Sequence, residues 1–507
     1  MRLEQNEKLY DAYLEHFQDI SQLEMMNLGF LKGIKSTTDQ MVTAEELLSN
    51  TKVPELDISV AEVERIFERP ATYTAITMDF KREVELNMLD WYYNYPDKVL
   101  YVEGARQTGK TYTIKKFIQT MWGSLRPQED VYTINLMSEE FSSKLRQYRN
   151  TRQELQYRDD GAVKNGIETF VEYCFPEFDS NTAKVLYIDE IQEDAGIYNS
   201  IREFARECKC RLIVSGSYLN VVSNAKLGNN KFKPPAGGSY TITMRSLSFI
   251  EFLEANGVIN SQTLLKSVHD YTEKDHLLFD EVQKLYQIYL QIGGYPEVVK
   301  TYIKTQAVEQ SFEVLEELIR NYFNESKPYL AMCNPVIEFE STFVSILEIM
   351  TNVSKRHKLK DIAVEIKNTL KRNKKTVNET DICSTLSWLE SGGFLKAIRR
   401  YKDISLRDYA SGQRYYFYDL GVANYVAHNS IIPESEWKGY IAENFAFLQI
   451  MDAYPKEMAS PLSTLGYLDI VQDSELGNAE LDFVYKDISS QTIPIFCLRF
   501  YCLLDEF

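Results

Sequence analysis

The chain has 507 residues, and at roughly 100 to 200 residues per domain this length predicts about three or four domains, which excludes a lone small binding module. Hydrophobic residues make up 44% and charged residues 26%, so disordered, collagen-like and coiled-coil proteins are excluded. The 56 Lys and Arg against 74 Asp and Glu give a net charge of −18, which excludes a protein that coats nucleic acid over its whole surface. A local basic patch stays open.

The cellular compartment is indicated by the cysteines and by the first residues. Seven cysteines, an odd count without a regular framework, suit a reducing compartment better than a disulfide scaffold. Residues 1–20 mix acids and bases within every turn and lack the apolar core of a signal peptide. No stretch reaches the roughly 18 uncharged apolar residues that a membrane-spanning helix requires. We therefore expect a soluble, cytoplasmic protein with no membrane partner.

Residues 1–95 are predicted to form an N-terminal helical region for packing or partner contacts, because apolar side chains recur every three or four residues in segments such as Ala61–Phe67. From about residue 96 to 255 the pattern changes to short β-rich runs separated by stretches of helical length. The runs cover Val99–Val102, Val131–Leu136, Val185–Ile188 and Leu212–Val214. Near-continuous apolar strands that alternate with helices indicate an α/β domain whose parallel sheet is covered on both faces.

A phosphate-binding loop is the strongest motif of the chain. The sequence GARQTGKT at Gly104–Thr111 matches G-x-x-x-x-G-K-[ST] and lies between an apolar strand and a segment with helical character, as that motif requires. Its glycines let the main chain curl so that N–H groups face a polyphosphate, Lys110 reaches the β and γ oxygens, and Thr111 holds Mg²⁺. The residues expected to bind ATP here are Gly104, Ala105, Arg106, Gln107, Thr108, Gly109, Lys110, Thr111 and Tyr112.

A second element of the same site is an acidic pair at the end of a later strand. The run Lys184–Ile188 leads directly into Asp189 and Glu190. We expect Asp189 to bind Mg²⁺ directly or through water, and Glu190 to orient and deprotonate the attacking water. A solvated acidic pair at a strand end is the alternative interpretation.

Two further positions are candidates for contacts with the γ-phosphate. Ser217 ends a third strand, where it could sense the γ-phosphate or simply cap the following turn. Arg245 could act as an arginine finger toward a neighbouring subunit of a homo-oligomer, since this cation can be supplied in trans. Arg202 and Arg206 are competitors for the finger, and a structural salt bridge is the alternative for each of the three.

Five motifs in a fixed order resemble a known family. They are the loop at Gly104–Thr111, IDEIQ at Ile188–Gln192, the strand end Ser215–Ser217, LSFIEF at Leu247–Phe252 and GGYPE at Gly293–Glu297. From about residue 96 to the end, the chain resembles prokaryotic AAA-type (P-loop) ATPases with a C-terminal domain of formerly unknown function. The resemblance implies a multidomain α/β fold: a P-loop NTPase parallel sheet, a helical lid, a winged helix and a restriction-endonuclease-like α/β C-terminal domain.

Helical spacing returns in residues 256–335, as in Leu285, Ile288 and Ile292, and predicts an all-α lid or linker. Residues 336–405 are predicted to form a winged-helix domain. In this segment a helix begins near Lys360, a basic turn follows, and a second helix places Ile382, Leu386 and Leu389 on one face. The wing would be a strand pair at Phe394–Ile398 and Tyr415–Tyr418.

Positive charge is concentrated in this winged-helix segment. Residues 341–402 carry 13 Lys and Arg against 6 Asp and Glu, a local excess of 7. We expect residues 355–402 to contact double-stranded DNA, with affinity that depends strongly on salt, through Lys371, Arg372, Lys374 and Lys375. The second helix is poor in arginine, which argues against sequence-specific base reading. A protein–protein spacer with a solvated basic turn is the alternative.

Residues 406–507 are predicted to form a degenerate or truncated restriction-endonuclease-like domain. Such a site requires a carboxylate on a helix, for which Glu443 is the candidate, an Asp at a strand start, Asp482, and an acid-x-Lys on the next strand. The third element is missing, because the chain reads FCLRF at Phe496–Phe500 and Arg499 cannot serve as a neutral base. The apolar last twelve residues lead us to expect a truncation or frame change near this point.

The predicted function is a Mg²⁺-dependent ATPase that hydrolyses ATP to ADP and phosphate, acts as a conformational switch and associates with DNA. Its catalytic residues would be Lys110, Glu190 and Arg245. Two alternatives stay open: an ATP-bound scaffold that hydrolyses slowly and recruits a protein partner, and an ATP-regulated, metal-dependent DNA nuclease.

Overall fold

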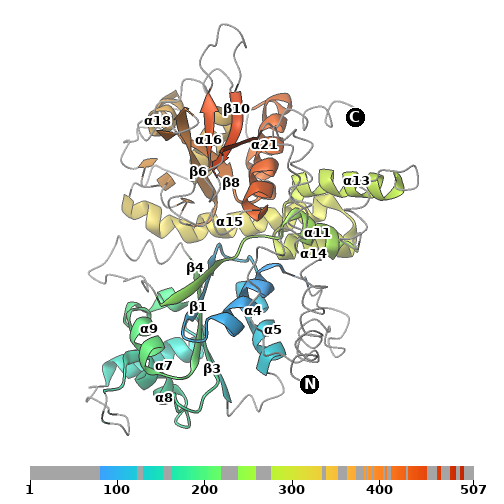
Figure 1. The fold of residues 1–507 in the computed structure, drawn as a ribbon. Coiled ribbons are helices and arrows are strands. Elements are labelled where there is room, and N and C mark those ends of the chain that lie inside the picture. Colours follow the sequence, from blue (N-terminus) through green and yellow to red (C-terminus); the bar gives the residue numbers. More distant parts are fainter. Residues whose placement is uncertain are drawn as a thin grey trace. The chain divides into compact units, whose positions relative to one another are not determined.

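The described residues form two compact units, of which the first ends at Arg245 and the second begins at Ser246 (Figure 1). The computed structural model describes residues 80, 82–122, 130–151, 157, 161, 163–217, 238–257, 276–333, 339–351, 362–372, 382–383, 385–386, 389–390, 392–403, 406–407, 413–429, 432–453, 465–469, 480–486 and 492–495. Most of the predicted N-terminal helical region lies outside these residues, and its described part contains the helix α4 (Val84–Asn94).

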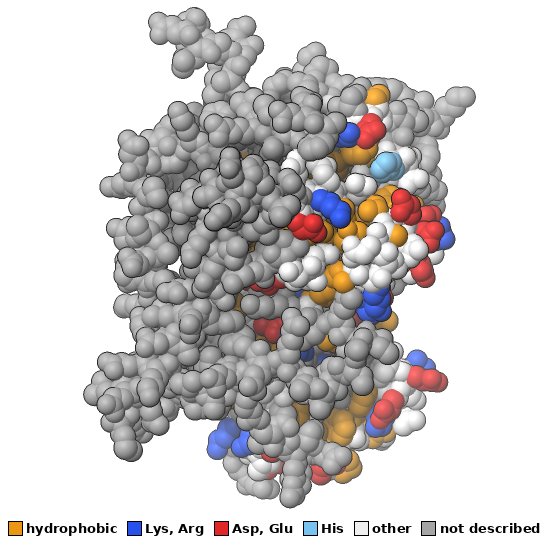
Figure 2. Space-filling view, turned by 90° about the vertical axis from the view of Figure 1, so that its right-hand side faces the viewer, with side chains coloured by type: hydrophobic (Ala, Val, Ile, Leu, Met, Phe, Trp, Pro, Cys, Tyr) orange, Lys and Arg blue, Asp and Glu red, His pale blue; other side chains and the backbone are white. Residues whose placement is uncertain are grey.

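The surface of the described residues is mixed in character. Among them, no helix is long and apolar enough to cross a bilayer. On the described part of the face in Figure 2, acidic and basic side chains lie interspersed among hydrophobic ones, without a large patch of one sign.

The first unit is built on a five-stranded sheet whose paired strands all run parallel, as the sequence predicts. Its strands are β1 (Val99–Gly104), β2 (Val131–Asn135), β3 (Val185–Asp189), β4 (Arg211–Ser217) and β5 (Ser239–Thr243), in the spatial order β2-β3-β4-β1-β5. After β1 the chain crosses to the far edge at β2, whereas β5 lies on the other side of β1. In open α/β sheets ligands bind at the carboxyl ends of the strands beside such a reversal of direction.

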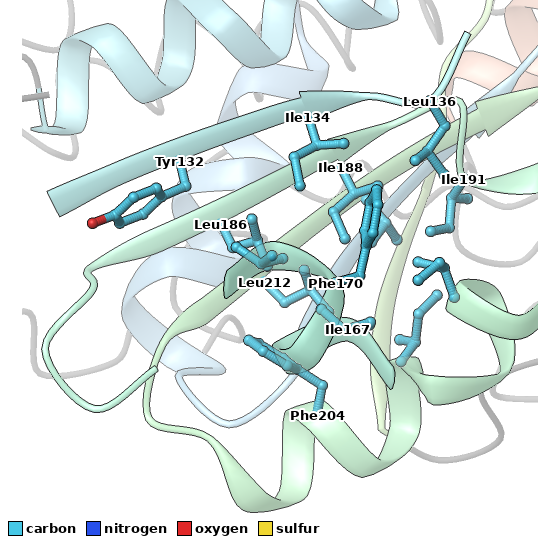
Figure 3. Close-up of a cluster of buried hydrophobic side chains, with 14 of the residues drawn as sticks. Tyr132, Ile134, Leu136, Ile167, Phe170, Leu186, Ile188, Ile191, Phe204 and Leu212 are labelled. Atoms are coloured by element: carbon cyan, nitrogen blue, oxygen red, sulfur yellow. The ribbon is translucent and has the colours of Figure 1, made fainter. Parts of the chain in front are cut away.

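Alternating side chains of the sheet form two separate cores. On β3, Leu186 and Ile188 face the helices α7 (Glu139–Asn150), α8 (Gly166–Cys174) and α9 (Ala195–Glu207), and Figure 3 shows both in one cluster with Phe170. Val185 and Tyr187 point the other way, toward the core that α4 and α5 (Lys110–Trp122) complete. The three central strands β1, β3 and β4 are therefore buried on both faces, which explains their near-continuous apolar sequences.

Among the described residues, the second unit begins at Ser246, ten residues before the predicted start of the helical segment at 256, and its first helix is α11 (Phe249–Ala255). Phe249 explains the difference, because its ring packs against Tyr286 and Tyr289 of α13 (His276–Ile292), with centroids 5.8 and 5.3 Å away. The predicted helical character of 256–335 is present in α13, α14 (Pro296–Thr305) and α15 (Val308–Cys333). Further helices with described bounds in this unit are α16 (Phe339–Thr351), α18 (Ile362–Arg372), α20 (Leu420–His428) and α21 (Glu434–Ala453).

The sheet of the second unit crosses the predicted boundary at 405/406. It contains β6 (Leu395–Asp403), β7 (Leu406–Arg407), β8 (Gln413–Phe417), β9 (Gly466–Asp469), β10 (Glu480–Lys486) and β11 (Thr492–Ile495). The predicted strand pair is present, with Leu395 of β6 opposite Phe417 of β8. β6 also pairs in parallel with β9, Arg399 lying opposite Gly466, so the hairpin continues into a larger sheet. The winged-helix and nuclease-like domains stay predictions.

One buried carboxylate, Asp419, ties distant segments of the second unit together. It caps α20 by accepting the Val422 N–H at 3.2 Å, and its other oxygen accepts the Gly294 N–H at 2.9 Å. The Ser246 side chain also bonds to it, while Leu247 N donates to Gly294 O at 2.7 Å. Burial raises the pKa of Asp419, and these hydrogen bonds act in the opposite direction. The motifs around Leu247, Gly293 and Asp419 are therefore joined in one structural contact.

Replacing Asp419 with alanine should lower the free energy of unfolding by about 3 kcal/mol, because buried N–H donors would lose their acceptor. Ser248→Ala is the matched control, since Ser248 caps α11 within a local capping box, and its loss should cost about 1 kcal/mol. Urea denaturation followed by circular dichroism measures both. Equal losses in the two variants would contradict the long-range role of Asp419.

Candidate functional site: a phosphate loop and an acidic strand end

The phosphate loop leaves β1 in a conformation that few side chains permit. A Cβ on Gly104 would lie 2.0 Å from the Met244 carbonyl oxygen, so this position accepts only glycine. Positive φ angles of 61° at Gln107 and 93° at Gly109 then curl the main chain before α5 begins. The predicted strand–loop–helix arrangement of Gly104–Thr111 is confirmed.

Lys110 is folded back onto the loop. Its ammonium group donates to the carbonyl oxygens of Gly104 and Ala105 at 3.0 and 2.8 Å. Burial lowers the pKa of Lys110 to about 8, while the nearby charges of Glu190 and Asp189 act in the opposite direction. A phosphate that replaced the two carbonyls would offer the ammonium a full negative charge.

Thr111 and Asp189 meet although 78 residues separate them in the sequence. The Thr111 hydroxyl donates to Asp189 Oδ2 at 2.9 Å, and the Asn135 side-chain amide donates to the same oxygen at 3.1 Å. The Ser215 hydroxyl, itself 2.9 Å from the Tyr187 hydroxyl, donates to Oδ1. The carboxylate is thus fixed by side chains from α5, β2 and β4.

This oxygen pair fits Mg²⁺, which binds through one or two protein oxygens and completes its octahedron with water and phosphate. Within the described ranges, no cluster of three or more His, Cys, Asp or Glu side chains could hold a metal ion. A magnesium–nucleotide site does not require a cage of protein ligands, so this pair of oxygens is compatible with such a site.

Glu190 lies directly after β3 in a left-handed conformation with φ 53°. The Gln192 side-chain amide donates to Glu190 Oε2, and its oxygen accepts the Ser217 N–H at 3.2 Å. A Cβ on Gly216 would lie 2.5 Å from that Gln192 oxygen, so the glycine leaves room for this bridge. Gln192 therefore links Glu190 to the end of β4.

Ser217 is placed beside the loop, because the register of β1 and β4 sets it opposite Gly104. Its side chain is 1% exposed, and its hydroxyl makes no hydrogen bond to any residue that the structure describes. A buried hydroxyl in this position is available to a ligand or to the turn that follows.

The remaining predicted nucleotide contacts lie at the surface or in the main chain. Tyr112 is exposed in the first turn of α5. Arg106 is partly exposed and donates to the Met137 sulfur at 3.9 Å. The competing fingers Arg202 and Arg206 are exposed on α9, and Arg206 pairs with Glu207 at 3.3 Å.

The predicted nuclease carboxylate Glu443 is enclosed in the second unit. It is 3% exposed, accepts the Tyr416 hydroxyl at 2.5 Å and lies 3.9 Å from the buried Arg414 guanidinium. The adjacent Asn444 side chain accepts the N–H of Phe417 at 2.7 Å and donates to its C=O at 2.8 Å. Asp482 belongs to β10, but its side chain, like Arg499, lies outside the described residues. The structure thus shows Glu443 bound by its neighbours, and the nuclease site stays a prediction.

Three residues near the candidate site are absent from the predicted set. Asn135 ends β2 at the same edge as Asp189, and that shared strand end was a usable signal. Gln192 lies inside the IDEIQ motif, but its position after the acidic pair does not indicate a function. Arg82 donates to the loop carbonyl of Thr108 at 2.9 Å from outside the predicted domain, and no sequence pattern marked it.

The family comparisons agree with this geometry. Residues 96–253 match the AAA domain family, and residues 283–431 match a domain of unknown function (DUF8612). No curated protein sequence matches the chain. The loop, the parallel sheet and the family match together support an AAA-type P-loop domain within residues 96–253.

Similar solved structures are distant. A Walker-type ATPase of Pyrococcus abyssi has 13% identity and a TM-score of 0.40, with 71% of this chain and 99% of that chain covered. The ORC1 protein of Aeropyrum pernix in complex with DNA has 12% identity and a TM-score of 0.29, with 71% and 95% covered. Likenesses at this distance add nothing on ligands or partners.

The lowered pKa of Lys110 predicts proton uptake on nucleotide binding. Below pH 8 the ammonium is already charged, so binding takes up little; above pH 8 the free protein has lost that proton, and a bound triphosphate restores it. Calorimetry in buffers of different ionisation enthalpy should show uptake approaching one proton per nucleotide near pH 9. Lys110→Arg should bind without this uptake, because arginine stays charged. Equal uptake in both proteins would contradict the assignment.

Proposed function

We propose that the first unit binds ATP with Mg²⁺ and hydrolyses it to ADP and phosphate. The observation that carries this proposal is the 2.9 Å contact between the Thr111 hydroxyl and Asp189, beside a loop whose lysine faces its own carbonyls. Thr111 and Asp189 would hold the ion, and Lys110 would turn from Gly104 and Ala105 to the β and γ oxygens. Magnesium supplies positive charge that neutralises the phosphates.

Glu190 is the proposed base that orients and deprotonates the attacking water. Gln192 supports this role, because the same side chain holds Glu190 and the Ser217 main chain. A γ-phosphate that engages the Ser217 hydroxyl would disturb this bridge and free Glu190 for water. Arg245 remains the proposed finger, supplied in trans by a second copy in a homo-oligomer.

The proposed ATPase acts as a conformational switch. Loss of the γ-phosphate releases segments that it had ordered, a transition common to P-loop proteins. In this chain the bridge through Gln192 connects the ends of β3 and β4, so both ends can respond to one phosphate group.

Glu190→Gln should retain nucleotide binding and lose hydrolysis, with kcat lowered by about 10²- to 10⁴-fold, because the amide cannot accept the proton. Lys110→Ala should lose nucleotide binding altogether. Calorimetry and phosphate release measure the two properties separately. Wild-type turnover in Glu190→Gln would reject the assignment, and binding without turnover in the wild-type protein would favour the slowly hydrolysing scaffold.

We also propose that the second unit associates with double-stranded DNA. The local basic excess of residues 341–402 supports this proposal. Lys371 and Arg372 end α18, whereas Lys374 and Lys375 lie outside the described residues. This contact would be made to DNA phosphates and would not depend on base sequence. If DNA binding is coupled to the conformational switch, the same DNA should raise the rate of ATP hydrolysis.

Replacing Lys374 and Lys375 together with glutamate should weaken DNA binding and reduce the slope of log affinity against log salt by about 2. Fluorescence anisotropy with a labelled duplex at several salt concentrations measures the slope. The control pair, Lys300→Glu with Lys304→Glu on α14, makes the same change in net charge outside the basic segment. The same loss in both pairs would contradict a local contact.

A further inference from the structure

Arg82 is a buried cation in the first unit, and it lies outside residues 96–253 of the AAA family match. Only 5% of this residue is exposed to solvent. One guanidinium nitrogen, Nη1, donates to the Thr108 carbonyl at 2.9 Å, and the other, Nη2, donates to the Arg245 carbonyl at 2.7 Å. A single planar group therefore joins the phosphate loop to a residue 163 positions later.

The loop end of this bridge is firmly held. Thr108 is 1% exposed, and its hydroxyl donates to the Ala105 carbonyl at 2.9 Å, the same oxygen that accepts from Lys110. Because the guanidinium presents its donors in a rigid fork, it fixes the position of Thr108 relative to Arg245. A shift of the loop on phosphate binding would pull on both carbonyls.

Arg82 is itself anchored by the helices that frame the loop. Its main-chain N–H donates to the Glu85 carboxylate at 3.3 Å, and Glu85 pairs with Lys116 at 3.0 Å. Lys116 belongs to α5, the helix that the loop opens. The arginine is thus connected to both α4 and α5 through Glu85.

The other end of the bridge is the last residue of the first unit. Arg245 is held by Arg82, and the next two residues are already held in the second unit. The Ser246 side chain bonds to Asp419, and Leu247 N donates to Gly294 O at 2.7 Å. Consecutive residues are therefore anchored in different units.

We infer that Arg82 is a positioning residue that couples the phosphate loop to the junction at Arg245–Ser246. Occupation of the loop by a triphosphate changes the path of the chain into the second unit through this guanidinium. The inference rests on the proposed function, since it requires a nucleotide in the loop.

Hydrogen exchange of peptides covering residues 246–257 tests the coupling, with and without a saturating, non-hydrolysable ATP analogue and Mg²⁺. In the wild-type protein the analogue should change exchange in these peptides. The single amide of Arg82→Gln cannot donate to both the Thr108 and the Arg245 carbonyls as the guanidinium does. This variant should therefore lose the exchange difference even when it is saturated with the analogue. Arg146→Gln is the control, because Arg146 is exposed on α7, and it should behave as the wild type.

Ser246→Ala keeps the test decisive if Arg82→Gln does not fold by circular dichroism. This smaller change removes the side-chain bond to Asp419 on the far side of the junction, and it should reduce the same exchange difference. A difference that persists undiminished in a folded Arg82→Gln, or a wild-type protein that binds the analogue without any change at 246–257, would overturn the coupling. Failure of the wild-type protein to bind the analogue would instead overturn the proposed function.

Discussion

The carboxylate of Asp189 is the interaction on which the candidate site depends. Hydroxyl and amide donors from α5, β2 and β4 converge on it. Each donor comes from a different element, and they meet only because parallel strands end at one edge of the sheet. If one strand shifted in register, the threonine of the loop and the acid of β3 would no longer be in hydrogen-bonding contact. The order and register of the strands therefore determine which side chains meet at Asp189.

Local sequence was sufficient to predict the parts of the site that lie within single elements. The loop is defined by glycines at fixed spacing, and the acidic pair follows a strand that is apolar throughout, so both could be found without the fold. Arg82 and Gln192 could not, because their partners are main-chain atoms of distant segments. A carbonyl or an N–H group has no sequence signature, and only the folded chain brings it near.

In the second unit, too, contacts between segments far apart in the sequence were not predictable. The strands around Leu395 and Phe417 were predictable as a pair, since a short connection joins them. Their continuation into β9 was not, because that partner begins 49 residues beyond the end of β8, at Gly466 against Phe417, and its sequence is compatible with many neighbours. The glycines at 293 and 294 were recognisable as a turn, but not the buried acid that holds it.

Among the described strands, β8 pairs with β6 alone, so no described strand lies along its other side. Asn444 meets one residue of that side with both ends of its amide, at the N–H and the C=O of Phe417. A side-chain amide has the same kinds of donor and acceptor as a peptide unit. Asn444, on α21, therefore takes the place of a neighbouring strand at Phe417. Tyr440 of the same helix donates its hydroxyl to the Tyr415 C=O at 2.8 Å, so two side chains bind main-chain groups that an exposed strand edge would offer to another chain.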